Sequence, residues 1–143
     1  MRFRRALAPL AALALAGVIA LAAPAEARAR TITVTMVGGV EFPPGDPDGT
    51  GTARFFIDPA TDRVCFLLVV SGVDLPFFAA HIHRAPPGEP GPPVVNLPAP
   101  VNGRSQGCVT DPDADAIVAN PGDYYVNVHN QPYPGGALRA QLG

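Results

Sequence analysis

Three histidines are the residues of this 143-residue chain that are best suited to chemistry. They stand in two short segments with strand character, residues 79–83 and 124–129. Successive side chains of a strand point to opposite faces, so His81 and His83 share one face, away from Ile82. His129 likewise faces away from Val128. If the two strands lie close together, the three imidazoles converge on one outer patch.

Imidazole is the commonest metal ligand among side chains, and three of them with an open fourth position suit one copper or zinc ion. The alternative is a structural role, in which outward histidines hydrogen-bond nearby groups such as Asn127, Glu89 or Tyr133. The residue pattern favours this structural role and keeps the metal site open. No serine or cysteine has the sequence context of a nucleophile, so we predict no catalytic residue.

The first 27 residues have the order of a secretory signal peptide. Arginines precede an apolar, alanine-rich run at residues 6–23, and a proline and a small-residue pattern follow. We predict cleavage after Ala27, with residues 28–143 exported as one domain to the periplasm or the extracellular space. The proline that ends the run makes a retained membrane span the weaker interpretation.

The predicted mature chain has an acidic balance. Three of the ten basic residues and one of the twelve acids lie in the first 27 positions, and all the basic residues are arginines. A mildly acidic surface without basic clusters argues against binding to nucleic acid or to an anionic membrane surface.

Cys65 and Cys108 are the two cysteines of the chain. In an exported protein such a pair most simply forms a disulfide. The bridge would close a loop of about 44 residues, which is worth roughly 4 kcal/mol in the chain-entropy model.

Short strands separated by turn residues predict an all-β protein, an antiparallel Greek-key sandwich or barrel. One short helical turn is expected near residues 112–118, after an aspartate and a proline. A segment with five prolines, residues 84–93, must be an ordered excursion or a flexible lip. The expected strands comprise residues 30–37, 50–57, 64–70, 77–83, 94–97, 105–110, 124–129 and 137–142.

Several phrases of the mature chain resemble the CHRD domain family and occur in its order. They are Glu41-Phe42-Pro43-Pro44, Gly49-Thr50-Gly51-Thr52-Ala53, Ala79-Ala80-His81-Ile82-His83, Gly88-Glu89-Pro90-Gly91-Pro92, Tyr125-Val126-Asn127-Val128-His129 and Pro134-Gly135-Gly136-Ala137-Leu138-Arg139-Ala140-Gln141-Leu142. The resemblance implies an exported, β-rich domain with no settled biochemical activity, immunoglobulin-like or superoxide-dismutase-like in fold.

The chain is more distantly similar to the copper-zinc superoxide dismutase barrel. That resemblance implies that His81, His83 and His129 match three copper ligands, whereas the bridging histidine and the zinc site have no match. That family also ends in a Gly-rich turn with an arginine and a closing strand, as Gly135, Gly136 and Arg139 would here. We expect these residues to be structural, with Arg139 pairing with a loop acid such as Asp123 or Glu41 and pinning the closing strand; the alternative is that Arg139 binds a ligand carboxylate.

Three functions follow from these features. The favoured one is a non-catalytic binding or structural module of the envelope, which contacts an unknown partner through loops 84–93 and 38–49. The second is a mononuclear copper or zinc protein, and the third is a degenerate dismutase-like redox protein.

Overall fold

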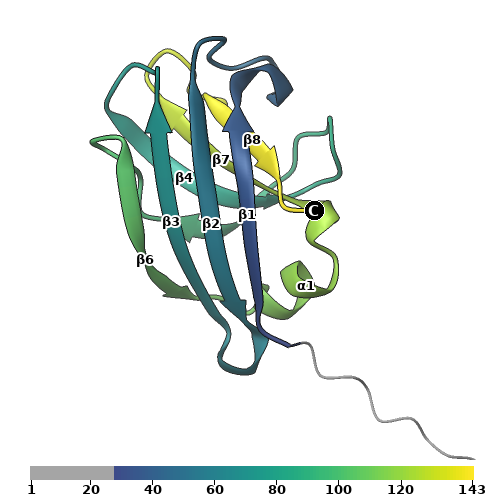
Figure 1. Ribbon diagram of the computed structural model, residues 1–143. Helices are drawn as coiled ribbons and strands as arrows, with labels where there is room; N and C mark the ends of the chain where they lie inside the picture. The colour runs from purple at the N-terminus through teal and green to yellow at the C-terminus, as the bar shows by residue number, and fades with distance from the viewer. Residues whose placement is uncertain (1–27) are drawn as a thin grey trace, which may run out of the picture.

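Eight segments with alternating apolar and polar side chains form one antiparallel sheet in the computed structural model, which describes residues 28–143 (Figure 1). Each observed strand agrees with its expected range to within a few residues, because the alternation marks which residues a strand can bury. The strands are β1 (Arg30–Val37), β2 (Thr50–Asp58), β3 (Arg63–Ser71), β4 (Phe77–Arg84), β5 (Pro93–Leu97), β6 (Arg104–Thr110), β7 (Tyr124–Asn130) and β8 (Leu138–Gln141).

The strand order is β5-β4-β7-β8-β1-β2-β3-β6. The sheet folds on itself, so that β1, β2, β3 and β6 form one layer and β4, β7 and β8 lie behind it (Figure 1). Non-consecutive neighbours such as β3 with β6 and β4 with β7 are Greek-key connections. The predicted antiparallel Greek-key sandwich or barrel is therefore confirmed, and the barrel is nearly closed, with β5 and β6 as its two edges.

Helical structure in the described residues is limited to short pieces. The helix α1 (Ala114–Ala119) lies where the helical turn was predicted. It begins after a turn in which the Asp111 side chain accepts a hydrogen bond from the backbone N–H of Asp113 at 3.0 Å. Three single 3₁₀ turns complete the set: η1 (Gly38–Val40), η2 (Pro59–Thr61) and η3 (Pro121–Asp123).

The core lies between the two layers of the barrel. Phe55, Ile57 and Leu68 of the front layer are fully buried, as are Ile82 and Val126 of the back layer. Burial of such side chains is worth about 1.5–3 kcal/mol each and fixes the register of every strand. The side chains of the opposite parity therefore remain outside the barrel.

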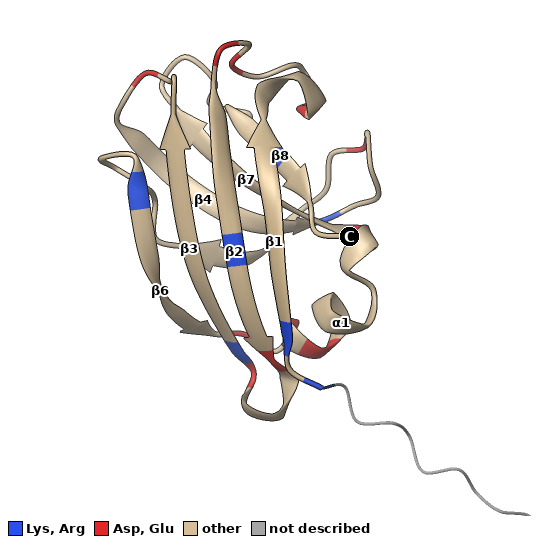
Figure 2. Ribbon diagram, viewed as in Figure 1, with Lys and Arg blue, Asp and Glu red and all other residues tan. Residues whose placement is uncertain are grey.

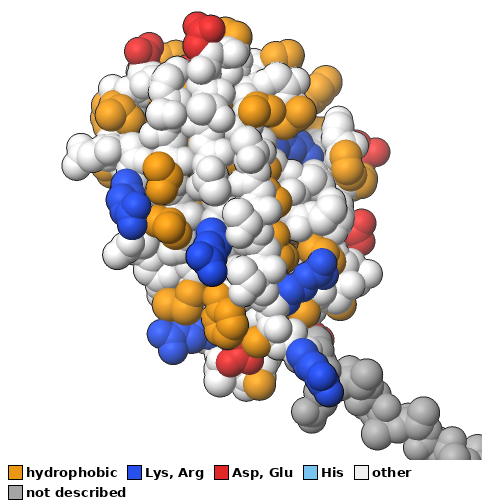
Figure 3. Space-filling model, in the orientation of Figure 1, with side chains coloured by type: hydrophobic (Ala, Val, Ile, Leu, Met, Phe, Trp, Pro, Cys, Tyr) orange, Lys and Arg blue, Asp and Glu red, His pale blue; other side chains and the backbone are white. Residues whose placement is uncertain are grey.

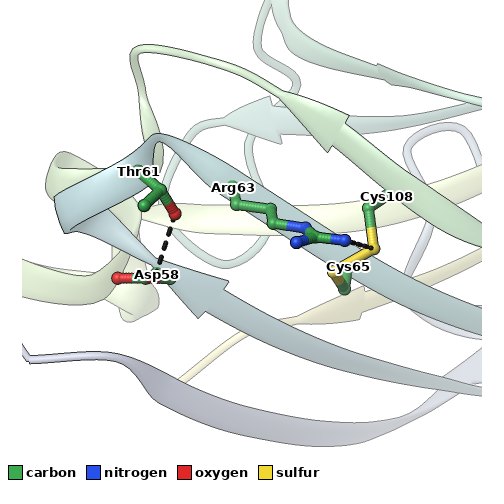
Figure 4. Close-up of a disulfide and its surroundings, with 5 residues drawn as sticks. All are labelled: Asp58, Thr61, Arg63, Cys65 and Cys108. Carbon is green, nitrogen blue, oxygen red and sulfur yellow. Dashed lines mark hydrogen bonds between the residues drawn. A yellow bond between two sulfur atoms is a disulfide. The ribbon is translucent and has the colours of Figure 1, made fainter.

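The Cys65–Cys108 disulfide links β3 to the edge strand β6, where the two residues face each other in the strand register (Figure 4). The predicted pairing is confirmed. At the same end of the barrel Arg63 donates a hydrogen bond to the sulfur of Cys108, and Thr61 donates one to Asp58 (Figure 4).

The outer face of the front layer carries exposed arginines on β1, β2, β3 and β6 (Figure 2). Between them lie exposed apolar side chains, among them Phe56 and Val69 (Figure 3). Acidic residues lie mainly in the loops at the two ends (Figure 2). No histidine is visible on this face (Figure 3).

Within residues 28–143, no helix is long and apolar enough to cross a membrane. The proposed signal peptide lies outside the described residues.

Candidate metal centre

The three histidines meet on the outer face of the back layer. Strands β4 and β7 are antiparallel neighbours, in which His83 faces Tyr125, His81 faces Asn127 and Ala79 faces His129. Directly opposed residues share a face of the sheet, so this register places all three imidazoles on one side.

The ring nitrogens of these histidines are close enough to share one ion. His81, His83 and His129 each offer a nitrogen, and these nitrogens lie within 4.8 Å of one another. The shortest approach is 3.1 Å, between Nδ1 of His81 and Nε2 of His129. The structure therefore brings together all the candidate ligands named from the sequence.

Two loops cover this patch of histidines. From strand alternation alone the patch is expected to face outward. The proline-rich segment between β4 and β5, residues 85–92, lies over His83, and the segment between β7 and β8, residues 131–137, lies over His129. As a result His83 is 8% exposed and His129 is 7% exposed, whereas His81 is half-buried.

Backbone carbonyls of the two loops fix the orientation of two rings. Nδ1 of His83 lies 2.8 Å from the carbonyl oxygen of Gly91, and Nδ1 of His129 lies 3.1 Å from that of Pro134. A carbonyl oxygen only accepts, so Nδ1 carries the proton in both rings and Nε2 carries the lone pair. Nε2 of His83 is buried and has no hydrogen-bond partner.

Burial keeps the three imidazoles neutral. It lowers the pKa of His129 to about 4. The hydrogen bond to the Pro134 carbonyl acts to raise this pKa, but its effect is smaller. Burial is also the largest cause of the lowered pKa of His83 and of His81, where the neighbouring His83 adds to it. Neutral imidazole is the form that binds a metal.

A stack of rings supports the centre on one side. The imidazole of His83 lies against the ring of Tyr125, with centroids 4.8 Å apart and planes 10° from parallel. The guanidinium of Arg139 lies 3.4 Å from the centroid of the same ring. Because β7 runs between β4 and β8, these two groups approach Tyr125 from opposite sides.

Arg139 is also the residue that holds the proline-rich loop. Its guanidinium donates to the carbonyl oxygens of Glu89 at 2.9 Å and Pro86 at 3.3 Å. It also donates to the side chain of Gln141. Its positive charge acts to lower the pKa of Glu41. The loop 84–93 is thus ordered in the structure.

Two further polar residues are buried in this part of the barrel: Asn127 contacts His129, and Glu41 lies against the closing turn. Asn127 is 1% exposed, and its Oδ1 lies 2.9 Å from Nε2 of His129. Glu41 is 7% exposed, and burial raises its pKa to about 7 against the effects of Arg139 and Asn127. Alternation places Asn127 on this face, whereas Glu41, in a distant loop, is expected from the sequence only as a partner of Arg139.

The closing turn makes room for that carboxylate. Gly136 has a φ of 145° and lies directly against Glu41, so that a side chain there would collide with the carboxylate oxygens. Gly135 has no such neighbour.

The model of the CHRD domain family matches residues 32–142. The chain belongs to the CHRD family. The matched region runs from within β1 to beyond the end of β8, so the histidine cluster and both loops are parts of this CHRD domain. No curated protein and no solved structure matches the chain.

Proposed function

We propose that this CHRD protein is exported and binds one copper or zinc ion through His81, His83 and His129. The observation that carries this proposal is the buried, unpartnered Nε2 of His83 beside two converging imidazoles. A buried polar atom without a partner costs about 1–3 kcal/mol, and a metal ion would satisfy it.

The spacing of the rings supports a shared ion. Nitrogens bound to one zinc ion at about 2.0–2.1 Å lie roughly 3–4 Å apart. The 3.1 Å approach of His81 to His129 is already in this range, and the third ring is within 4.8 Å. Small side-chain rotations bring all three nitrogens to bonding distance.

The surroundings of the rings support the same proposal. Histidines that bind metals usually donate their second N–H to a carboxylate or a backbone carbonyl, which fixes the ring and its tautomer. Gly91 and Pro134 supply such carbonyls to His83 and His129. The lowered pKa values also mean that binding at neutral pH displaces few protons from the rings.

Three imidazoles suit zinc and both oxidation states of copper. A bound copper ion would supply one-electron chemistry, and a bound zinc ion would supply a Lewis acid or a structural crosslink. The protein's own part is to position the rings, keep them neutral and limit access of water. Export is supported by the leader-like first 27 residues and by the disulfide, which persists in oxidising compartments.

The test is metal analysis of the purified protein and calorimetric titration with Cu²⁺, Zn²⁺ and, under reducing buffer that spares the disulfide, Cu⁺. We expect one ion per chain, and at least a tenfold weaker affinity in His81→Ala, His83→Ala and His129→Ala. These are the only histidines of the chain, so a signal from bound imidazole nitrogen in the copper(II) spectrum must come from them.

Equal binding by the wild type and the three variants would overturn the metal proposal. The histidines would then be structural, and the favoured function would return to a binding module whose two loops contact a partner.

A further inference from the structure

We propose that the amide oxygen of Asn127 is the fourth ligand of this ion. The inference rests on the proposed metal site and extends it from three nitrogens to a closed set of three nitrogens and one oxygen. Asn127 then acts as a ligand and not only as a neighbour of His129.

The position of Asn127 in the sheet is the first argument. Asn127 lies directly opposite His81 in the register of β4 and β7, two residues before His129. It is 1% exposed, so its amide points into the covered space among the rings and not into solvent. Its Oδ1 is 2.9 Å from Nε2 of His129, a separation that fits two ligands of one ion.

The second argument is a conflict between acceptors. Nε2 of His129 carries a lone pair, because Nδ1 donates to the carbonyl of Pro134. The amide oxygen of Asn127 also only accepts. Their 2.9 Å contact therefore joins two acceptors, and a cation placed between them turns this repulsion into two bonds.

His83 contributes a further lone pair, because its ring nitrogen lies within 4.8 Å of those of His81 and His129. Nε2 of His83 has no donor to satisfy its lone pair. Three lone pairs, from His83, His129 and Asn127, thus converge beside the nitrogen of His81.

The test combines three variants with a spectroscopic probe. Co²⁺ is titrated into the wild type and into Asn127→Ala, Asn127→Asp and Asn96→Ala, and its visible absorption reports the ligand set. Asn96 is the matched control, since it also faces His81 in the register but lies exposed on the edge strand β5. Zn²⁺ affinity is measured for the same four proteins.

We expect Asn127→Ala to bind Zn²⁺ about 10- to 100-fold more weakly, with an altered Co²⁺ spectrum, while Asn96→Ala matches the wild type. Asn127→Asp should bind more tightly than Asn127→Ala, because a carboxylate oxygen replaces the amide oxygen as ligand. A merely structural asparagine would leave the Co²⁺ absorption of Asn127→Ala like that of the wild type, because the set of ligands would be unchanged.

A measurement on the wild type removes dependence on folding of the variants. In ¹⁵N-labelled protein the side-chain amide signal of Asn127 should shift strongly on addition of one equivalent of Zn²⁺. An unchanged signal, or an Asn127→Ala variant with wild-type affinity and spectrum, overturns the fourth ligand while the histidine site stands. Absence of binding by the wild type overturns both proposals.

Discussion

His129 and Glu41 are two buried groups that respond to pH in opposite directions. The pKa of His129 is lowered to about 4, so the fold is fully stabilised by its neutral ring above pH 6.5 and loses this stability as pH falls toward 4. The pKa of Glu41 is raised to about 7, so its neutral form carries no penalty below pH 4.5, and stability is lost as pH rises toward 7. The two effects oppose each other over the same range.

Replacing Glu41 by glutamine removes one of these two effects. Glu41→Gln should leave stability unchanged near pH 4 and raise it by about 2 kcal/mol at pH 8, where the wild type must ionise a buried carboxyl. Urea denaturation at the two pH values measures the difference.

The exposed Glu89→Gln is the control for that experiment, because it removes a carboxylate that is not buried. A gain for Glu41→Gln that is the same at both pH values would contradict the assignment of the effect to ionisation.

At the residue scale, the sequence is informative wherever strand alternation applies. It places His81 and His83 on one face of their strand, and Asn127 and His129 on one face of theirs, without knowledge of the fold. Alternation does not place Glu41, which the sequence offers only as a partner of Arg139, because the path of its loop depends on the whole barrel. Nor does alternation indicate burial of His83 and His129, since the residues that cover them lie in other segments.

The two loops turn an exposed sheet face into an enclosed centre. The segment 85–92 is tied down at several points: Arg139 binds two of its carbonyls, and the Gly91 N–H donates to the hydroxyl of Tyr125 at 3.2 Å. Gly91 is required there, because a Cβ would collide with the carbonyl of Arg84. The sequence leaves the choice between an ordered and a flexible loop open, since its prolines are compatible with both.

Replacing Arg139 by lysine should loosen this loop. Lysine keeps the charge but loses the planar group that donates to both Glu89 and Pro86 while stacking on Tyr125. We expect Arg139→Lys to destabilise the fold by about 1–3 kcal/mol and to speed hydrogen exchange at the Gly91 amide.

Arg54→Lys serves as the comparison, because Arg54 is exposed on β2 in the front layer. If both variants exchange at Gly91 like the wild type, the loop is held by its own backbone and not by Arg139.

For the whole molecule, the disulfide and the histidine centre lie in different layers of the barrel. Cys65 and Cys108 tie β3 to the edge strand β6, whereas the histidines lie on β4 and β7. The hydrophobic core separates the two features. The bridge therefore stabilises the fold without contact with the ligands.

Removal of the bridge should lower stability and leave the centre intact. The double variant Cys65→Ala/Cys108→Ala should lose about 2–4 kcal/mol in urea denaturation, because the unfolded chain regains the freedom of a long loop. Its zinc affinity under native conditions should match the wild type. A loss of affinity in the fully folded variant would show that the two layers are coupled.

The overall architecture was more predictable than the site. Alternation gives the strands, and the presence of only two cysteines gives the pairing, which the structure confirms. The strand order could not be predicted in this way, because β4 pairs with β7, and the paired residues lie 40 or more positions apart in the chain. Local sequence signals do not extend over such separations. From the sequence, the histidines could therefore be predicted to converge only if their two strands were neighbours, which the structure shows.

The open surroundings of Gly135 have a practical consequence. A side chain at this position would meet nothing within 4 Å, and Gly135 follows Pro134, whose carbonyl holds His129. Both cysteines are paired, so Gly135→Cys would introduce the single reactive thiol of the protein. A fluorescent dye attached there would sit on the loop beside the centre and outside its ligand set, as a reporter of loop movement in real time.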